Sequence, residues 1–234
     1  MRNFVVTATP RSGTTFTSVV LSRMGCRCGH EQVFQPWKPW GFHGWGEFDG
    51  DASCYAVPYL YQLPRDTLVV HQVRDPLATI RSLANWGLFS PFSIRRHIVL
   101  PIARFTRGKP PRELALRFMK VHSRDAWRRR DGDIARAAQH WVDWNRAIER
   151  QSQEMGLEYV RFRVEDLRGA KLLELADSIS VHPSTLPDDL PGPLNAGRLS
   201  SFTDVSPDDL PADLRSEVGV LAGSYGYEFN VMVR

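Results

Sequence analysis

The segment between residues 10 and 15 combines arginine, hydroxyl side chains and a glycine in a pattern suited to anion binding. It consists of Pro10, Arg11, Ser12, Gly13, Thr14 and Thr15. It follows an apolar run and precedes a stretch with helical periodicity, so its backbone N–H groups would lie at a helix N-terminus, where anions bind. Gly13 permits close approach of a ligand, and Arg11 supplies a cation beside it. We predict a phosphate-binding loop here.

A second segment adds a separate cation and a hydroxyl group. Arg74 follows another apolar run in Val73-Arg74-Asp75-Pro76, and Ser82 comes eight residues later. Eight residues are about two helical turns, so an arginine at a strand end and a serine on the following helix could hold a second phosphate. Two such sites after neighbouring strands predict one ligand with two separated phosphate groups.

The first loop lacks the lysine of a nucleoside triphosphatase. The Walker pattern is G-x-x-x-x-G-K-[ST]. Here Thr14 follows Gly13 directly, and Ala8 stands five residues before that glycine. The ammonium group that would reach the β- and γ-phosphates is therefore missing, which predicts a phosphate loop without the equipment for NTP hydrolysis.

Apolar runs and helical periodicity alternate along the chain, which is typical of a parallel α/β sheet. Strands are expected over residues 3–9, 67–73 and 157–164, and strand character over 225–233. Helices are expected over residues 16–24, 77–86, 112–130, 134–155, 172–180 and 214–222. We predict an α/β fold of the P-loop type, a three-layer domain whose central parallel sheet is flanked by helices. No linker divides residues 1–234, so we expect a single domain, with irregular loops over 33–48 and 183–211.

The two segments resemble the cofactor signatures of the sulfotransferases that use 3′-phosphoadenosine 5′-phosphosulfate (PAPS). The first loop matches the one that holds the 5′-phosphosulfate in that family, and Arg74 with Ser82 matches the pair that holds the 3′-phosphate. Further similarity to tyrosylprotein sulfotransferases and their bacterial relatives lies in residues 27–31, 144–149 and 163–167. The resemblance runs over about residues 3–168. It implies PAPS as the cosubstrate, 3′-phosphoadenosine 5′-phosphate as the product, and no obligatory metal ion.

Transfer to a hydroxyl group also needs a base near the acceptor oxygen. The resemblance places Glu31 at the position of the catalytic glutamate, and Arg11 at the departing phosphate. His30 is the alternative base. Arg198 is a further candidate for the 3′-phosphate, and Trp86 or Phe162 could pack against the adenine. The aromatic loop offers Trp37, Trp40 and Trp45 as stacking platforms for an acceptor, which is otherwise undefined: a glycan, a phenol, another small molecule or a peptide.

Composition limits the class of protein. With 42% hydrophobic and 24% charged residues, a disordered chain is excluded. Three cysteines cannot form a disulfide framework, and no apolar run reaches the length of a membrane span, so we expect a cytoplasmic protein. The cysteines and histidines lack metal-ligand spacing, and we predict no metal site.

The distribution of basic residues is compatible with two other functions. Residues 95–130 hold 12 basic and two acidic side chains, a local excess of ten positive charges that suits an acidic acceptor or a solvated helix face. The alternatives to a sulfotransferase are a P-loop kinase acting on a small molecule and a non-catalytic polyanion-binding protein. We expect no nucleic-acid partner.

Overall fold

A computed structural model describes residues 2–36, 41–89, 112–181 and 204–229. The chain divides into two compact units. The first unit consists of Met1–Arg74 and Trp144–Ala196, and the second of Asp75–Asp143 and Gly197–Arg234.

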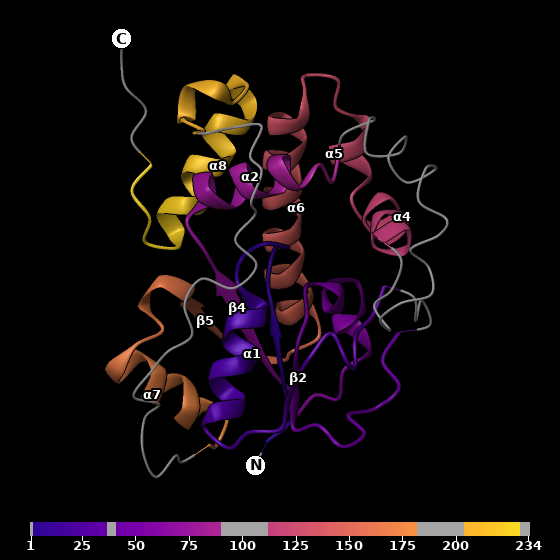
Figure 1. Cartoon of the computed structure of the whole chain (residues 1–234), viewed down its shortest axis with the longest axis vertical. Coiled ribbons are helices and arrows are strands. Elements are labelled where there is room, and N and C mark those ends of the chain that lie inside the picture. Colours follow the sequence, from indigo (N-terminus) through magenta and orange to yellow (C-terminus); the bar gives the residue numbers. More distant parts are fainter. Residues whose placement is uncertain (1, 37–40, 90–111, 182–203, 230–234) are drawn as a thin grey trace. The chain divides into compact units, whose positions relative to one another are not determined.

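The first unit contains one parallel sheet. Its five described strands lie in the order β2 (Cys28–His30), β3 (Gly50–Ala52), β1 (Phe4–Thr7), β4 (Leu68–Val73) and β5 (Glu158–Arg163) (Figure 1). All four neighbouring pairs are parallel. The prediction of an α/β fold with a central parallel sheet is confirmed.

Strands β1 and β4 are buried along their whole length, and such strands appear in a sequence as continuous apolar runs. The sequence therefore predicted them. It did not predict β2 and β3, which have three residues each and few β-branched side chains. Gly50 pairs with Phe4 in the register of β1 and β3, and a Cβ atom at this position would collide with the Phe4 ring. Here a glycine belongs to a strand because a neighbouring ring occupies the space of its side chain.

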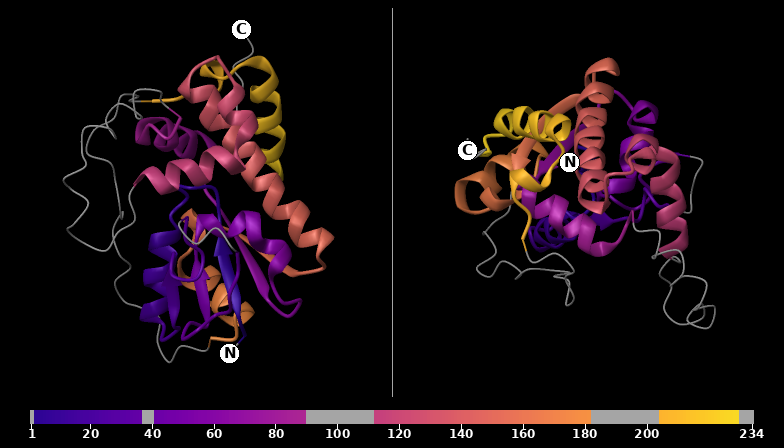
Figure 2. Two further views of the ribbon diagram at one scale, coloured as in Figure 1. Left: turned by 90° about the vertical axis from the view of Figure 1, so that its right-hand side faces the viewer. Right: turned by 90° about the horizontal axis from the view of Figure 1, so that it is seen from above.

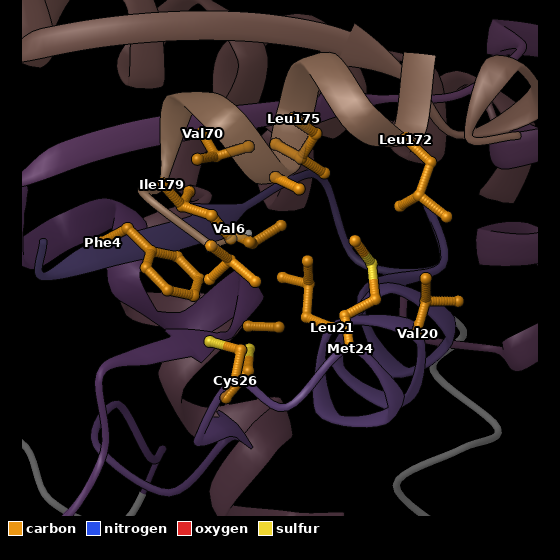
Figure 3. Packing of buried hydrophobic residues seen from close by; sticks show 14 of the residues in the cluster. Phe4, Val6, Val20, Leu21, Met24, Cys26, Val70, Leu172, Leu175 and Ile179 are labelled. Atoms are coloured by element: carbon orange, nitrogen blue, oxygen red, sulfur yellow. The ribbon is translucent and has the colours of Figure 1, made fainter. Parts of the chain in front are cut away.

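Helices cover both faces of this sheet. On one face, α1 (Thr14–Arg23) and α7 (Gly169–Ser178) pack their apolar side chains against β1 and β4 (Figure 3). On the other face lie the 3₁₀ segment η1 (Cys54–Gln62) and the C-terminal half of α6 (Asp133–Glu154). There Trp144 Nε1 donates to the Cys54 carbonyl at 3.2 Å, and His71 Nε2 bonds to Asn145 Oδ1 at 2.8 Å. The first unit thus has three layers.

The described part of the second unit is helical (Figure 2). It contains the following elements: α2 (Pro76–Trp86), α4 (Arg112–His122), α5 (Arg124–Arg128), the N-terminal half of α6, the 3₁₀ turn η4 (Pro207–Asp209) and α8 (Ala212–Ser224). The prediction of one helix over 112–130 is wrong, because the helix is interrupted at Ser123, between α4 and α5. The Ser123 hydroxyl instead contacts His140 Nδ1 at 2.8 Å, and both side chains are buried.

The three remaining loop and tail predictions differ in outcome. Residues 225–229, where strand character was expected, form no strand, and the rest of that tail lies outside the described residues. Residues 41–48 of the predicted aromatic loop contain neither helix nor strand. Most of the predicted loop over 183–211 also lies outside the described residues.

Candidate functional site

The candidate site lies at the edge of the sheet where the parallel strands end. From β1 the chain passes through α1 to the β2 side of the sheet, whereas after β4 it returns through α6 to β5 on the other side. The two connections cover opposite faces, so the strand order reverses between β1 and β4. Ligands of open parallel sheets bind at such a switch point, outside the carboxyl ends of the strands. The loop of residues 10–15 follows β1, and Arg74 follows β4.

The backbone of this loop has the form of an anion cradle. Arg11 has φ 73° and Gly13 has φ 95°, whereas Ser12 between them is not in the left-handed region. Alternation of this kind is typical of an anion-binding nest. In this loop the Ser12 N–H group donates to the Thr9 carbonyl at 3.2 Å, so the cradle is limited to the Gly13 N–H group and the first N–H groups of α1. Helix α1 then begins at Thr14, and the first N–H groups of a helix have no partner within the helix. The predicted loop thus lies directly before the start of α1, and its binding of an anion stays a prediction.

Two side chains at the C-terminal end of β4 donate hydrogen bonds to carbonyl groups of the loop. Arg74 Nη1 donates to the Arg11 carbonyl at 2.9 Å, and Gln72 Nε2 donates to the Ser12 carbonyl at 2.5 Å. The Thr17 hydroxyl, on α1, donates to Gln72 Oε1 at 2.6 Å. Gln72 was not predicted from the sequence. A signal was present, because Gln72 is a polar residue within the otherwise mostly apolar run of a buried strand.

Positive charge gathers at the same place. Arg11 is half-buried, and its burial, together with the charge of Arg74, lowers the pKa of its guanidinium group. Two cations this close repel each other, and an anion bound beside them would relieve that repulsion. Directly before the loop, Thr9 Oγ1 is buried and makes no hydrogen bond with the described residues. Buried polar atoms of this kind are rare in folded proteins and call for an explanation such as an absent ligand.

Both candidates for the base lie beside the first turn of α1. His30 Nε2 is 3.0 Å from Thr15 Oγ1 and 3.4 Å from Thr14 Oγ1. Glu31 Oε1 lies 3.9 Å from the same nitrogen, and the Glu31 side chain is 28% exposed, so it remains accessible to a substrate. Glu31 has φ 55°, a conformation that side chains other than Gly, Asn and Asp rarely adopt. A carboxylate is thus held in a strained position beside the cradle.

The turn that carries Glu31 is built around a buried carboxylate. Asp51, at the middle of β3, accepts hydrogen bonds from the N–H groups of Gln32 at 3.0 Å, Val33 at 3.2 Å and Phe34 at 3.0 Å. Asp51 is fully buried. A Cβ atom at position 29 would lie 2.7 Å from Asp51 Oδ1, so only glycine leaves room for this carboxylate. Asp51 was not predicted from the sequence.

The remaining predicted residues have different positions. Pro10 is buried at the start of the loop. Ser82 is half-buried on α2, in the second unit. Arg198, Trp37 and Trp40 lie outside the described residues. The described aromatic candidates have these surroundings: Trp45 packs edge-on against Phe42 with ring centroids 5.1 Å apart, Phe162 packs against the apolar core, and Trp86 is half-buried on α2.

Other polar groups have structural roles. Asp75 Oδ1 accepts a hydrogen bond from Ala78 N at 2.7 Å and caps α2. Cys26, Cys28 and Cys54 are buried, and burial raises the pKa of each thiol, to about 12 for Cys26. Reactive cysteines require a lowered pKa, so these three are packing residues. Among the described residues, no three side chains of His, Cys, Asp or Glu lie close enough to share a metal ion. Within the same residues, no helix has the length and hydropathy of a membrane span.

No protein-family model matches the chain, and no curated protein matches it significantly. What indicates a function for this chain is the geometry of the first unit and the resemblance of the two short motifs.

Proposed function

We propose that this chain is a sulfotransferase, which transfers a sulfuryl group from PAPS to a hydroxyl group of an acceptor. The observation that carries the proposal is the pair of guanidinium groups, Arg11 and Arg74, beside a left-handed backbone cradle at the switch point of the sheet. The cradle has no lysine, which fits a ligand whose terminal group carries less charge than a γ-phosphate.

The residues fit the 5′ end of such a cosubstrate. Arg11, the Gly13 N–H group with the first N–H groups of α1, and the hydroxyls of Ser12, Thr14 and Thr15 would hold the 5′-phosphate. Hydrogen bonds to such a charged group are stronger than those between neutral groups. The resemblance assigns Arg74 and Ser82 to the 3′-phosphate, and Arg198 is a further candidate that no motif supports. When bound, the cosubstrate supplies the sulfuryl group and a phosphate leaving group.

The chain's own residues then have two tasks. Arg11 and the cradle stabilise the negative charge that develops on the departing phosphate oxygens, which is the largest contribution in many group transfers. Glu31 accepts the proton of the acceptor hydroxyl, which makes that oxygen a better nucleophile. His30, within hydrogen-bonding distance of Thr15 and close to Glu31, would orient this carboxylate rather than replace it.

Within the part of the chain that the structure describes, neither alternative function has a specific observation in its favour. A kinase would need a magnesium ligand near the loop, but the only aspartate directly after β4, Asp75, caps α2. A polyanion-binding protein would need the basic side chains of residues 95–130 to pair with its ligand and not with acidic side chains of the chain itself. In the described part of this segment, Arg128 pairs with Asp125, and Arg129 pairs with Asp131 and Asp213.

Substitution of the two arginines tests the proposal. Removing one charge-assisted contact costs about 1.5–3 kcal/mol, so Arg11→Ala and Arg74→Ala should each weaken 3′-phosphoadenosine 5′-phosphate binding about 10- to 150-fold. The matched control is Arg150→Ala, which removes an exposed arginine of α6 that pairs with Glu154 at 4.0 Å. Calorimetric titration gives the affinities. Binding by both variants within about threefold of the unsubstituted protein would refute the assignment of these arginines.

A further inference from the structure

Gln72 makes a shorter hydrogen bond to the anion loop, 2.5 Å to the Ser12 carbonyl, than Arg74 does, 2.9 Å to the Arg11 carbonyl. Its side chain is fully buried, it lies two residues before Arg74 on β4, and its Nε2 donates to the Ser12 carbonyl. We propose that Gln72 is a positioning residue, which acts through the Ser12 carbonyl to aim the Gly13 N–H group at a bound 5′-phosphate. This inference rests on the proposed function, because it assumes that the loop binds that phosphate.

Peptide geometry connects Gln72 to the ligand side of the loop. In a trans peptide unit the C=O and N–H groups point in opposite directions within one plane. The carbonyl of Ser12 and the N–H group of Gly13 belong to the same unit. When Gln72 draws the Ser12 carbonyl toward the protein interior, the Gly13 N–H group must point away from it, toward the cradle.

The amide of glutamine suits this position because it donates at one end and accepts at the other. Its Nε2 donates to the Ser12 carbonyl at 2.5 Å, and its Oε1 accepts from the Thr17 hydroxyl at 2.6 Å. Thr17 is itself fully buried. The amide is therefore fixed in one orientation between the loop and α1. A carboxylate would place an acceptor against the Ser12 carbonyl, and an aliphatic side chain would leave that carbonyl without its donor.

Gly13 packs on the same amide. A Cβ atom at this position would lie 3.3 Å from Gln72 Nε2 and 3.3 Å from Val164 Cγ2, and Gly13 has a left-handed φ of 95°. The Gln72 amide thus lies next to Gly13, the residue whose N–H group we propose that it orients. Arg74 makes the equivalent contact with the preceding carbonyl, that of Arg11. The end of β4 therefore sets the direction of two successive peptide units of the loop.

The test compares three ligands that separate the two phosphate positions: 3′-phosphoadenosine 5′-phosphate, 5′-AMP and 3′-AMP. Gln72→Met keeps the shape of the side chain but removes both hydrogen bonds. We expect it to bind the first two ligands at least about tenfold more weakly, with less than about threefold change for 3′-AMP. Thr17→Ala, which frees the amide from the α1 side, should give a smaller loss of the same pattern, and it serves if Gln72→Met does not fold.

Val69→Ala is the matched control, since it destabilises the same strand without contacting the loop, and it should bind all three ligands as the unsubstituted protein does. Unchanged 5′-AMP binding by Gln72→Met, or an equal loss for all three ligands, would overturn the inference.

A second readout is the Gly13 amide resonance during titration with inorganic phosphate. It should shift in the unsubstituted protein and not in Gln72→Met, whereas equal shifts, or none in either, would overturn the inference. If the unsubstituted protein binds no nucleotide, the proposed function fails, and the resonance still decides the role of Gln72.

Discussion

At the scale of single residues, backbone strain coincides with the candidate chemistry. Among the described residues other than glycine, Arg11, Glu31 and Ser180 have left-handed φ angles, and the first two belong to the candidate site. For an L-residue this conformation costs about 1–2 kcal/mol, and such strain is concentrated at functional positions. Arg11 and Glu31 were both named as candidates from the sequence. Their strain could not be predicted, because neither arginine nor glutamate favours that conformation.

Glu31 allows the strain to be separated from the chemistry. Glu31→Gly removes both the carboxylate and the steric cost, whereas Glu31→Ala removes only the carboxylate. We expect the glycine variant to be more stable than the alanine variant by about 1 kcal/mol. Chemical unfolding measures this difference. Both variants should retain 3′-phosphoadenosine 5′-phosphate binding and lose sulfuryl transfer, measured as formation of that product with a panel of phenols, sugars and hydroxyl-bearing peptides.

Equal stabilities of the two variants would show that the φ of Glu31 is not strained. Full transfer activity in either variant would instead remove Glu31 as the base and leave His30, which lies 3.9 Å from it, as the alternative.

At the scale of elements, pairing between strands creates secondary structure that the local sequence pattern does not predict. The runs of β1 and β4 are apolar enough to be recognised, and β5 was predicted at nearly its observed position. The short strands β2 and β3 exist because they pair in parallel with each other and with β1. Since β2 ends at His30 and β3 contains Asp51, the turn that carries Glu31 depends on two strands that local sequence does not reveal.

Strand β4 also carries a buried imidazole whose titration can be measured. His71 bonds through Nε2 to Asn145 Oδ1 at 2.8 Å and through Nδ1 to the Tyr159 hydroxyl at 2.7 Å. Because Asn145 Oδ1 can only accept, the neutral ring carries its proton on Nε2 and accepts from Tyr159. Burial lowers the pKa of His71 from 6.5 to about 4. The folded protein therefore holds this histidine neutral at pH values where the unfolded chain protonates it.

The sign of the pH effect follows from this difference. Above pH 6.5 both states are neutral and the stability is complete. Between pH 6.5 and 4 the unfolded state binds the extra proton, so the free energy of unfolding falls as the pH falls, by about 3 kcal/mol in total. His71→Gln should lack this contribution, and urea unfolding at pH 7 and pH 4.5 checks it. A variant with the same pH dependence as the unsubstituted protein would contradict the assignment. Burial also lowers the pKa of His140, in the second unit, to about 3. Its contribution to the pH dependence of stability should therefore remain in His71→Gln.

At the scale of the whole molecule, the fold class followed from the sequence more fully than the function. The alternation of apolar runs and periodic stretches predicted a parallel sheet with helices, and the first unit has that architecture. The two arginine-containing segments were placed at strand ends, where Arg11 and Arg74 indeed lie. Gln72 and Asp51 were missed because each acts on backbone atoms of a distant segment, and such contacts leave no local pattern. The acceptor is undefined for a similar reason, since no short motif encodes it.

The most direct test of the central claim is calorimetric titration of the intact chain with 3′-phosphoadenosine 5′-phosphate, in parallel with ATP and 5′-AMP. A ligand that satisfies two separate phosphate sites gains charge-assisted contacts that a single phosphate cannot make. We predict a Kd on the order of micromolar for the bisphosphate and at least about tenfold weaker binding of 5′-AMP. No binding of the bisphosphate, or a preference for ATP, would contradict the claim that this cradle serves a sulfotransferase.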